Sequence, residues 1–278
     1  YSSGNVKIRR EMTLDLDGNY VKHGQWTMYS EAGEEIAGGK FVANERDGSW
    51  YKQIAWGESP VLNTPPYPDY EVPFRSEATF KQGQLVGVWK ISDNQGRAIS
   101  EWSYRNGKLH GQAKWFYPDG SVRESIEYDD GLLNGAWTIV DKSGKELQAD
   151  TYVKGRKYAS KQETYENGTL KWDGMFLHET FVVNTPDDWW NTRPVSYKPV
   201  GEPERHGEFT SWYENGQKKF SGNFEHEVRS GEFTWWHPNT QVAVKGNFVD
   251  GDRNGLWVWW HENGQKAIQG TYETGKLK

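Results

Sequence analysis

The sequence predicts an all-β protein, built as an elongated, twisted, single antiparallel meander sheet of about nine β-hairpin repeats. Three observations support this fold class. A glycine returns at intervals of about 24 residues, aromatic residues follow it at fixed distances, and short alternating stretches are separated by turn dipeptides. The repeat is the main source of information in this chain, because Leu, Ile and Val runs are missing and aromatic residues must supply most of the buried apolar area.

Each repeat opens on a glycine, and successive openings keep the same interval wherever nothing is inserted. The opening glycines are Gly24, Gly48, Gly87, Gly111, Gly135, Gly207, Gly231 and Gly255. Ala159 takes this place in a degenerate repeat, whose YENG at 165–168 matches YENG at 213–216. Counting the degenerate repeat gives nine units.

The first half of each repeat has the alternation of a β-strand. In WVWW, Trp257 and Trp259 point to one face of a strand, and Val258 and Trp260 point to the other. A second glycine follows nine residues after the opening, usually in Asn-Gly, Asp-Gly or Ser-Gly, which are hairpin-turn dipeptides. One repeat is therefore one β-hairpin.

The second half of each repeat predicts how neighbouring hairpins pack. In KKFSGNF at 218–224, Phe220 and Phe224 share a face with Gly222, which leaves room for a ring from the neighbouring strand. We expect the rings to pack each hairpin on the next, so that each repeat contacts mainly its neighbours.

We expect one continuous repeat domain over residues 1–278. It consists of a partial N-terminal repeat (1–23), repeats over 24–56, 78–175 and 206–278, and two loop insertions at 57–77 and 176–205. The chain begins inside the pattern, since Tyr1 to Gly4 align with Tyr213 to Gly216, and we expect either a longer native protein or a processed fragment.

Both insertions contain Asn-Thr-Pro after an apolar pair, and their prolines favour loops outside the sheet. Long loops on a regular scaffold often carry function. Tyr67 and Tyr70 in the first insertion, and Trp189 and Trp190 in the second, are therefore candidate partner-binding residues. In the alternative interpretation these rings fold back to cover the exposed apolar face of the sheet.

Composition bounds the function. The net charge of −6 argues against nucleic acid as a partner, and no stretch is apolar enough to span a bilayer, so direct membrane insertion is not expected. Without cysteine, disulfides and thiolate zinc sites are excluded. Zero cysteine favours an extracytoplasmic bacterial location over a cytoplasmic one.

Motifs for catalysis are missing: the sequence has no G-x-S-x-G, H-E-x-x-H or phosphate-loop pattern, and we expect neither an enzyme nor a cofactor. DGDRNG at 250–255 matches the first half of a calcium loop, which makes Asp250, Asp252 and Asn254 a weak calcium candidate. His261 stands where that loop needs its glutamate, so no metal site is predicted overall.

The consensus G-x-W-x-x-W-Y-x-x-N-G, followed by an aromatic residue and G-x-x-x-G, resembles the MORN repeat (membrane occupation and recognition nexus). It is most similar to the bacterial variant found in antitoxins of toxin–antitoxin pairs. HGEFTSWYENGQKKFSGNF at 206–224 and NGLWVWWHENGQKAIQGTY at 254–272 carry the resemblance best. The resemblance implies single-sheet hairpin repeats and a role in protein binding or scaffolding, and it carries over no catalytic residue.

Two functions follow as hypotheses. The first is a non-catalytic repeat scaffold, antitoxin-like in the bacterial case, that binds another protein through a sheet face and the two insertions. The second is a module that binds glycans, choline or cell-wall fragments on an aromatic ladder of Trp212, Trp236 and Trp260, which recur once per repeat opposite the core face. The sequence leaves the partner and the oligomeric state open.

Overall fold

A computed structural model of the chain describes residues 1–55, 60–63, 65–178 and 202–278. The described residues form twenty β-strands and two short 3-10 helices. The strands are β1 (Ile8–Leu14), β2 (Tyr20–Tyr29), β3 (Glu35–Val42), β4 (Glu45–Ile54), β5 (Phe74–Lys81), β6 (Gln84–Ser92), β7 (Ala98–Arg105), β8 (Lys108–Phe116), β9 (Val122–Asp129), β10 (Leu132–Val140), β11 (Glu146–Val153), β12 (Arg156–Thr164), β13 (Leu170–His178), β14 (Glu204–Trp212), β15 (Lys218–Glu225), β16 (Val228–Trp236), β17 (Val242–Val249), β18 (Asp252–Trp260), β19 (Lys266–Glu273) and β20 (Lys276–Leu277). The helices are η1 (Pro60–Asn63) and η2 (Tyr67–Asp69), and neither is long or apolar enough to cross a membrane.

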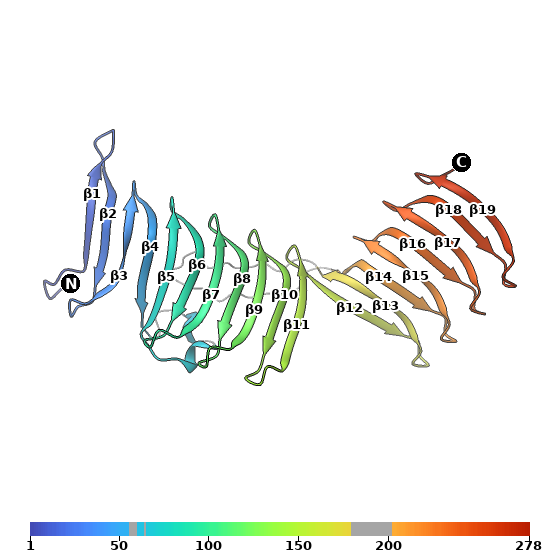
Figure 1. Ribbon diagram of the computed structural model, residues 1–278, viewed down its shortest axis with the longest axis horizontal. Coiled ribbons are helices and arrows are strands. Elements are labelled where there is room, and N and C mark those ends of the chain that lie inside the picture. Colours follow the sequence, from blue (N-terminus) through green and yellow to red (C-terminus); the bar gives the residue numbers. More distant parts are fainter. Residues whose placement is uncertain (56–59, 64, 179–201) are drawn as a thin grey trace. The chain divides into compact units, whose positions relative to one another are not determined.

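The described chain falls into two compact units, residues 1–155 and residues 156–178 with 202–278. In the first unit, β1 to β11 pair in sequence order, each strand antiparallel to the next (Figure 1). In the second unit, β12 to β20 pair in the same way. The predicted all-β antiparallel meander of hairpins is confirmed. That residues 1–278 act as one continuous domain stays a prediction.

The boundaries of the insertions differ from the expected ones. β5 already begins at Phe74, inside the expected 57–77 insertion, and the two 3-10 helices lie before it. Around the expected 176–205 insertion, β13 continues to His178 and β14 begins at Glu204. In both places the residues nearest the sheet join a strand, because their backbone groups gain partners there.

The hairpin turns use left-handed backbone where the second glycine was predicted. Gly33, Gly96, Gly120, Gly144, Gly168, Gly216 and Gly264 all have positive φ. In the repeat that opens at Gly231 this place is held by Thr240, whose φ is 75°. A β-branched residue is strained in this region, and the missing glycine had hidden the turn from the sequence pattern.

The opening glycine also has a specific role. Gly231 has a φ of 78°, and the pairing of β15 with β16 shifts register close to it. The opening glycine is thus part of a β-bulge, which bends the strand and increases its twist.

The rings pack as expected from the glycine in the second strand of the hairpin. A Cβ added at Gly222 would collide with the ring of Phe233, and one at Gly246 would collide with Trp257. Each ring therefore lies on the backbone of the preceding hairpin, which only glycine permits at this distance. The prediction that Gly222 leaves room for a neighbouring ring is confirmed.

In one repeat of the first unit, the large ring and the small residue exchange strands. Ala113 holds the third position of its repeat, where most repeats have a ring, and it lies opposite Trp102 of β7. Trp102 packs edge-on against Trp89, with 4.3 Å between ring centroids. Both Trp102 and Ala113 are buried, so the volume missing from one strand is supplied by its partner.

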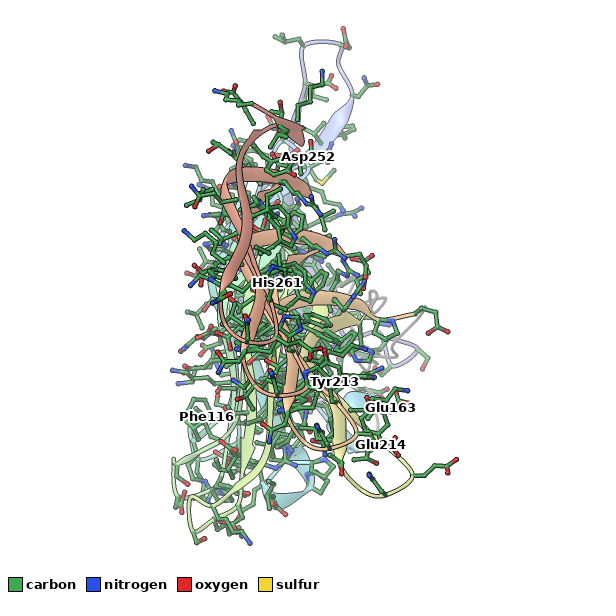
Figure 2. The ribbon with its side chains drawn as sticks, turned by 90° about the vertical axis from the view of Figure 1, so that its right-hand side faces the viewer. Phe116, Glu163, Tyr213, Glu214, Asp252 and His261 are labelled. Carbon is green, nitrogen blue, oxygen red and sulfur yellow. The ribbon has the colours of Figure 1, made fainter. Side chains whose placement is uncertain are left out.

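Hydrogen bonds from the hairpin turns tie each repeat to the next. The hydroxyl of Tyr213 (Figure 2) donates to the carbonyl oxygen of Trp236 over 2.8 Å, and Tyr165 donates to Trp212 over 2.9 Å. Tyr1 donates to Tyr29 in the same way, in agreement with the alignment of Tyr1 with Tyr213. These bonds link consecutive hairpins at their turns, in addition to the strand ladder.

Candidate functional site

Each unit has two chemically different faces. Period two places Phe209, Phe233 and Trp257 on one face of the strands, which we call the aromatic face, and places Thr210, Thr234 and similar residues on the opposite, polar face. The two units differ in how far their aromatic faces are buried. This difference locates the candidate site.

In the first unit, part of the aromatic face is covered by the first insertion. The Tyr67 side chain is only 1% exposed, and its hydroxyl hydrogen-bonds the Ser100 hydroxyl over 3.0 Å. Burial raises the pKa of Tyr67 to about 12. Trp89, Ile91 and Ile99 are buried in the same region. Tyr67 therefore packs as a cover on the sheet.

Tyr70 is also buried and takes over a repeat function. Its hydroxyl donates to the carbonyl oxygen of Phe116 over 2.9 Å, which is the bond that a turn tyrosine makes elsewhere. The corresponding turn position of the preceding repeat is Asp93, which is buried and binds Arg97. Burial raises the pKa of Tyr70 to about 12. For Tyr67 and Tyr70 the fold-back interpretation describes the structure, and their rings offer little surface to a partner.

In the second unit, a row of half-buried rings lies on the aromatic face. We call these rings, with the arginines described next, the open aromatic face. The rings are Trp172, Phe220, Trp235, Trp259 and Tyr272. They pack on a buried layer, in which Phe233 is 0% exposed and Trp257 is 1% exposed.

Three arginines lie over this layer at intervals of one repeat. The guanidinium of Arg205 is 4.3 Å from the centre of the Phe224 ring, and that of Arg229 is 5.2 Å from Phe248. The Arg253 guanidinium is 4.7 Å from the Trp257 ring. Each arginine stacks its planar group on an aromatic ring while the group keeps contact with water.

One position of the repeat separates three repeats of the first unit from the others, in which it is a cation, Lys22 and Arg46 of the first unit included. It lies two residues before the opening glycine and pairs with the last aromatic residue of the preceding repeat. In the second unit the pairs include Phe224 with Arg229 and Phe248 with Arg253. In three repeats of the first unit Leu85, Leu109 and Leu133 hold the position, and all three are buried. In these three repeats a guanidinium would be buried without a partner, which is costly.

The arginines differ in their ion pairing. Arg205 binds Glu227 through its side chain, with 2.6 Å between Nη2 and Oε2. Within the described residues, Arg229 and Arg253 make no ion pair; Arg253 donates one long bond, 3.4 Å, to the Tyr272 hydroxyl. Between them lies a hollow of about 190 Å³, lined by Trp235, Val244, Phe248, Trp257 and Trp259. Two guanidiniums with spare donors thus flank an apolar depression.

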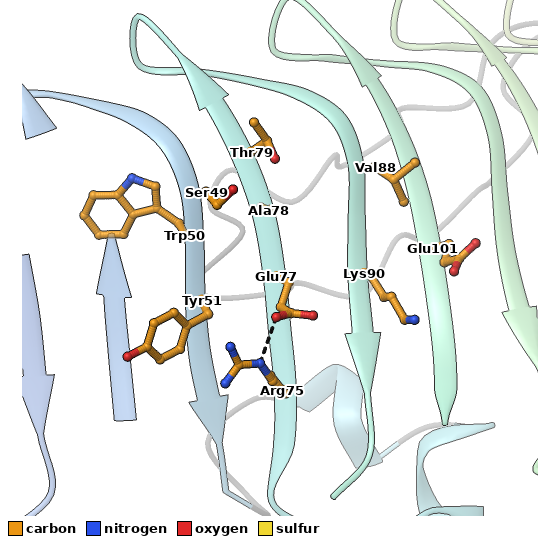
Figure 3. Close-up of a pocket in the computed structure, with 10 residues that line it drawn as sticks. All are labelled: Ser49, Trp50, Tyr51, Arg75, Glu77, Ala78, Thr79, Val88, Lys90 and Glu101. Carbon is orange, nitrogen blue, oxygen red and sulfur yellow. Dashed lines mark hydrogen bonds and ion pairs between the residues drawn. The ribbon is translucent and has the colours of Figure 1, made fainter. Parts of the chain in front are cut away.

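A larger hollow, about 520 Å³, lies on the first unit between β4 and β7 (Figure 3). Its charges are largely matched within the sheet. Arg75 binds Glu77 over 2.8 Å and stacks on the Tyr51 ring at 4.5 Å. Lys90 and Glu101 face each other as a cross-strand pair. This hollow therefore has little unmatched charge with which to select a ligand.

A histidine cluster occurs on the second unit. Glu204 accepts from Arg156 over 2.9 Å and contacts the Nδ1 atom of His226 over 3.1 Å. The His226 and His206 rings are 4.8 Å apart. Burial, followed by the charge of His226, lowers the pKa of His206, while the bonds from Arg156 and His226 lower the pKa of Glu204.

The remaining predicted residues are placed as follows. Trp212, Trp236 and Trp260 are half-buried at the turn ends of β14, β16 and β18, and the Lys218 ammonium lies 5.9 Å from the Trp236 ring. Trp189 and Trp190 lie outside the described residues.

The calcium candidate has a different structure from a calcium loop. Asp250 is in the left-handed turn before β18, and Asp252 and Asn254 belong to the strand itself, where Asn254 pairs with Asn247. Within the described residues, no three acidic, histidine or cysteine side chains are grouped to hold a metal ion. A strand holds these side chains apart, whereas a calcium loop wraps its ligands around the ion.

Three segments match the MORN repeat variant family: residues 109–130, 205–226 and 253–274. These three segments are similar to MORN repeats of this variant type. Each matched segment begins two residues before an opening glycine, at Leu109, Arg205 and Arg253. MORN repeats are generally non-catalytic and bind proteins or membranes. No curated protein matches the chain.

The arginine row was missed in the sequence, although a signal for it was present. Arg205, Arg229 and Arg253 recur at the same interval as the aromatic positions. Comparing residues two before each opening glycine would have shown leucine in three repeats and a cation in the others. That contrast is readable without a structure.

Proposed function

We propose that this chain is a non-catalytic repeat scaffold that binds another protein through the open aromatic face of its second unit. The observation that supports it most is the row of half-buried rings beneath a row of arginines, of which Arg229 and Arg253 make no ion pair within the described residues. Half-exposed tryptophan and arginine together are the residues most enriched at the energetic centres of protein interfaces. An antitoxin that binds its toxin would be one case of this function.

The two adjacent tryptophans of β16 provide the test. Trp235 belongs to the open aromatic face and Trp236 points to the polar face, so Trp235→Ala and Trp236→Ala form a matched pair. The bound partner is crosslinked in extract of the native cell, pulled down with the chain, and identified by mass spectrometry. We expect Trp235→Ala to lose the partner and Trp236→Ala to keep it, with circular dichroism confirming that both variants fold.

The opposite result would contradict the proposal. Loss of the partner with Trp236→Ala alone would move the site to the polar face, where Trp212, Trp236 and Trp260 form the predicted glycan ladder. The two predicted contact residues of the second insertion are proposed as an additional contact. Their double variant, Trp189→Ala with Trp190→Ala, should weaken capture of the same partner.

A further inference from the structure

Arg229 and Arg253, which make no ion pair within the described residues, indicate which chemical groups the partner presents to this face. This inference rests on the proposed function. Arg229 and Arg253 occupy the same position in consecutive repeats and lie on the same face. Each carries up to five N–H donors in a planar fork that suits a carboxylate. Because Arg205 already binds Glu227, it shows how the other two would bind an acid: Nε and Nη2 approach the same carboxylate oxygen at 2.7 and 2.6 Å.

The charges around the two arginines leave them without an acid. Glu232 of β16 binds Lys245 of the intervening strand, β17, on the polar face. Asp250 and Asp252 lie at the adjacent turn, and within the described residues neither makes an ion pair with Arg229 or Arg253. Farther along this face the Lys161 ammonium lies 5.9 Å from the Phe176 ring, and the Trp172 Nε1 donates to the Glu163 carboxylate. The part of the open aromatic face around Arg229 and Arg253 is therefore positive, although the chain as a whole is acidic.

The spacing and the hollow set the geometry of the ligand. Consecutive repeats are two strands apart, about 10 Å at roughly 4.8 Å per strand. The hollow between the arginines is apolar and has space for a single large side chain. We infer that the open aromatic face binds an acidic segment of a partner protein that presents two carboxylates about one repeat apart, on either side of an apolar side chain.

An amphipathic helix meets this requirement. Glutamates seven residues apart on a helix are about 10.5 Å apart along the axis and share a face with the residues three and four positions after the first. In the pattern E-x-x-L-L-x-x-E, the two glutamates therefore match Arg229 and Arg253, and the two leucines match the hollow between them. An anionic membrane fits less well, because it needs a broad basic surface, whereas acidic Glu225, Glu227, Asp250 and Asp252 lie at the turns beside this face.

The test uses a fluorescent helical peptide that contains E-x-x-L-L-x-x-E and a twin in which both glutamates are glutamine. Binding to the full chain is measured by fluorescence anisotropy. We expect the glutamate peptide to bind about tenfold or more tightly than its twin, and its affinity to fall as salt rises from about 50 to about 300 mM. Arg229→Gln and Arg253→Gln should each remove most of the difference between the two peptides.

Lys245→Gln is the matched control, because it removes one positive charge from the polar face of the same strands. It should leave the binding of both peptides unchanged. Equal binding of the two peptides, no binding of either, or equal effects of Arg229→Gln and Lys245→Gln would each overturn the inference. Arginine-dependent binding to phosphatidylserine vesicles in place of the peptide would overturn it in favour of a membrane.

The two proposals can fail separately. If crosslinking places a partner on the open aromatic face but the glutamate peptide does not bind, the acidic-segment inference is wrong and the proposed function stands. If the crosslinked partner survives Trp235→Ala and is lost with Trp236→Ala, the proposed function itself is wrong.

Discussion

The repeats that open at Gly87, Gly111 and Gly135 follow the same plan as those that open at Gly207, Gly231 and Gly255, yet their aromatic faces end in different environments. In the first group Leu85, Leu109 and Leu133 are buried against aromatic partners. In the second group arginines stack on those partners and remain in contact with water. In these six repeats a single position thus holds a buried leucine in one group and an arginine in contact with water in the other.

This contrast shows how a uniform scaffold acquires a specific surface. The hairpin geometry, set by glycines and rings, is nearly the same in both groups, so it provides rigidity without selecting a partner. Selection is left to the few positions that the geometry does not constrain, and the arginine row is the clearest of them. The comparison can be tested by exchanging residues between the two groups.

The largest effect is expected when a charge is placed in the buried group. Leu109→Arg puts a guanidinium at a site that is 3% exposed and lies opposite Tyr104. We expect the free energy of unfolding of the first unit to fall by about 3–5 kcal/mol, because the charge is buried without a partner. Urea unfolding followed by tryptophan fluorescence measures it.

The reverse exchange is its control. Arg253→Leu replaces a stacked guanidinium with an apolar side chain on the open face, and stability should change by less than about 1 kcal/mol. A small effect of Leu109→Arg would mean that the first unit's aromatic face is also open to water.

A smaller loss is expected where the ring rests on glycine. Gly246→Ala adds a Cβ that collides with Trp257. Overpacking of this kind costs about 1–3 kcal/mol, which thermal and urea unfolding would detect. Lys245→Ala, on the polar face next to it, is the matched control. Unchanged stability in Gly246→Ala would show that the ring does not lie on the backbone as described.

Relief of the strain in one turn should raise stability by a similar or smaller amount. Thr240 has positive φ where Gly120 and Gly144 stand in the first unit. Thr240→Gly should stabilise the second unit by about 1 kcal/mol, because glycine adopts this conformation without a clash. The converse variant, Gly120→Thr, should destabilise by a similar amount in the same urea titration. If both variants lose stability, the turn is not strained.

Mild acid should affect the second unit through its histidines. The folded-state pKa values of His206 and His178 are lowered, chiefly by burial, so the unfolded chain binds protons first as pH falls. The stability that these neutral histidines contribute is present above the unfolded-state pKa of about 6.5 and is lost as pH falls below it. We expect stability to decline between about pH 7 and pH 5.5, and less steeply in His206→Gln than in the control His261→Gln. Equal slopes in the two variants would contradict the role given to His206.

The parts of the fold that depend on the repeat could be predicted from the sequence. Glycine spacing and period two predicted the hairpins, and Gly222 predicted where a neighbouring ring would lie, because both follow from local geometry. The turn at Thr240 could not be predicted, because the sequence has no glycine there to mark a left-handed residue. The fold-back of Tyr67 and Tyr70 could be stated only as an alternative, since it depends on contacts far apart in the chain.

The candidate site was less predictable than the fold. Pattern analysis selected aromatic residues of the insertions and of the turn ends, whereas the open face lies on the strands themselves. The repeat pattern identified Trp235 and Trp259 only as packing residues. Whether such a ring is half-exposed depends on what covers it, and the leucine–arginine contrast is the one trace of that cover in the sequence.

Hydroxyl-radical footprinting of tryptophan, read by mass spectrometry, tests the central contrast most directly. We expect strong labelling of Trp235 and Trp259 and very little of Trp89 and Trp102 in the same sample. Equal labelling of the two pairs would contradict it, because the two aromatic faces would then be covered, or open, to the same extent.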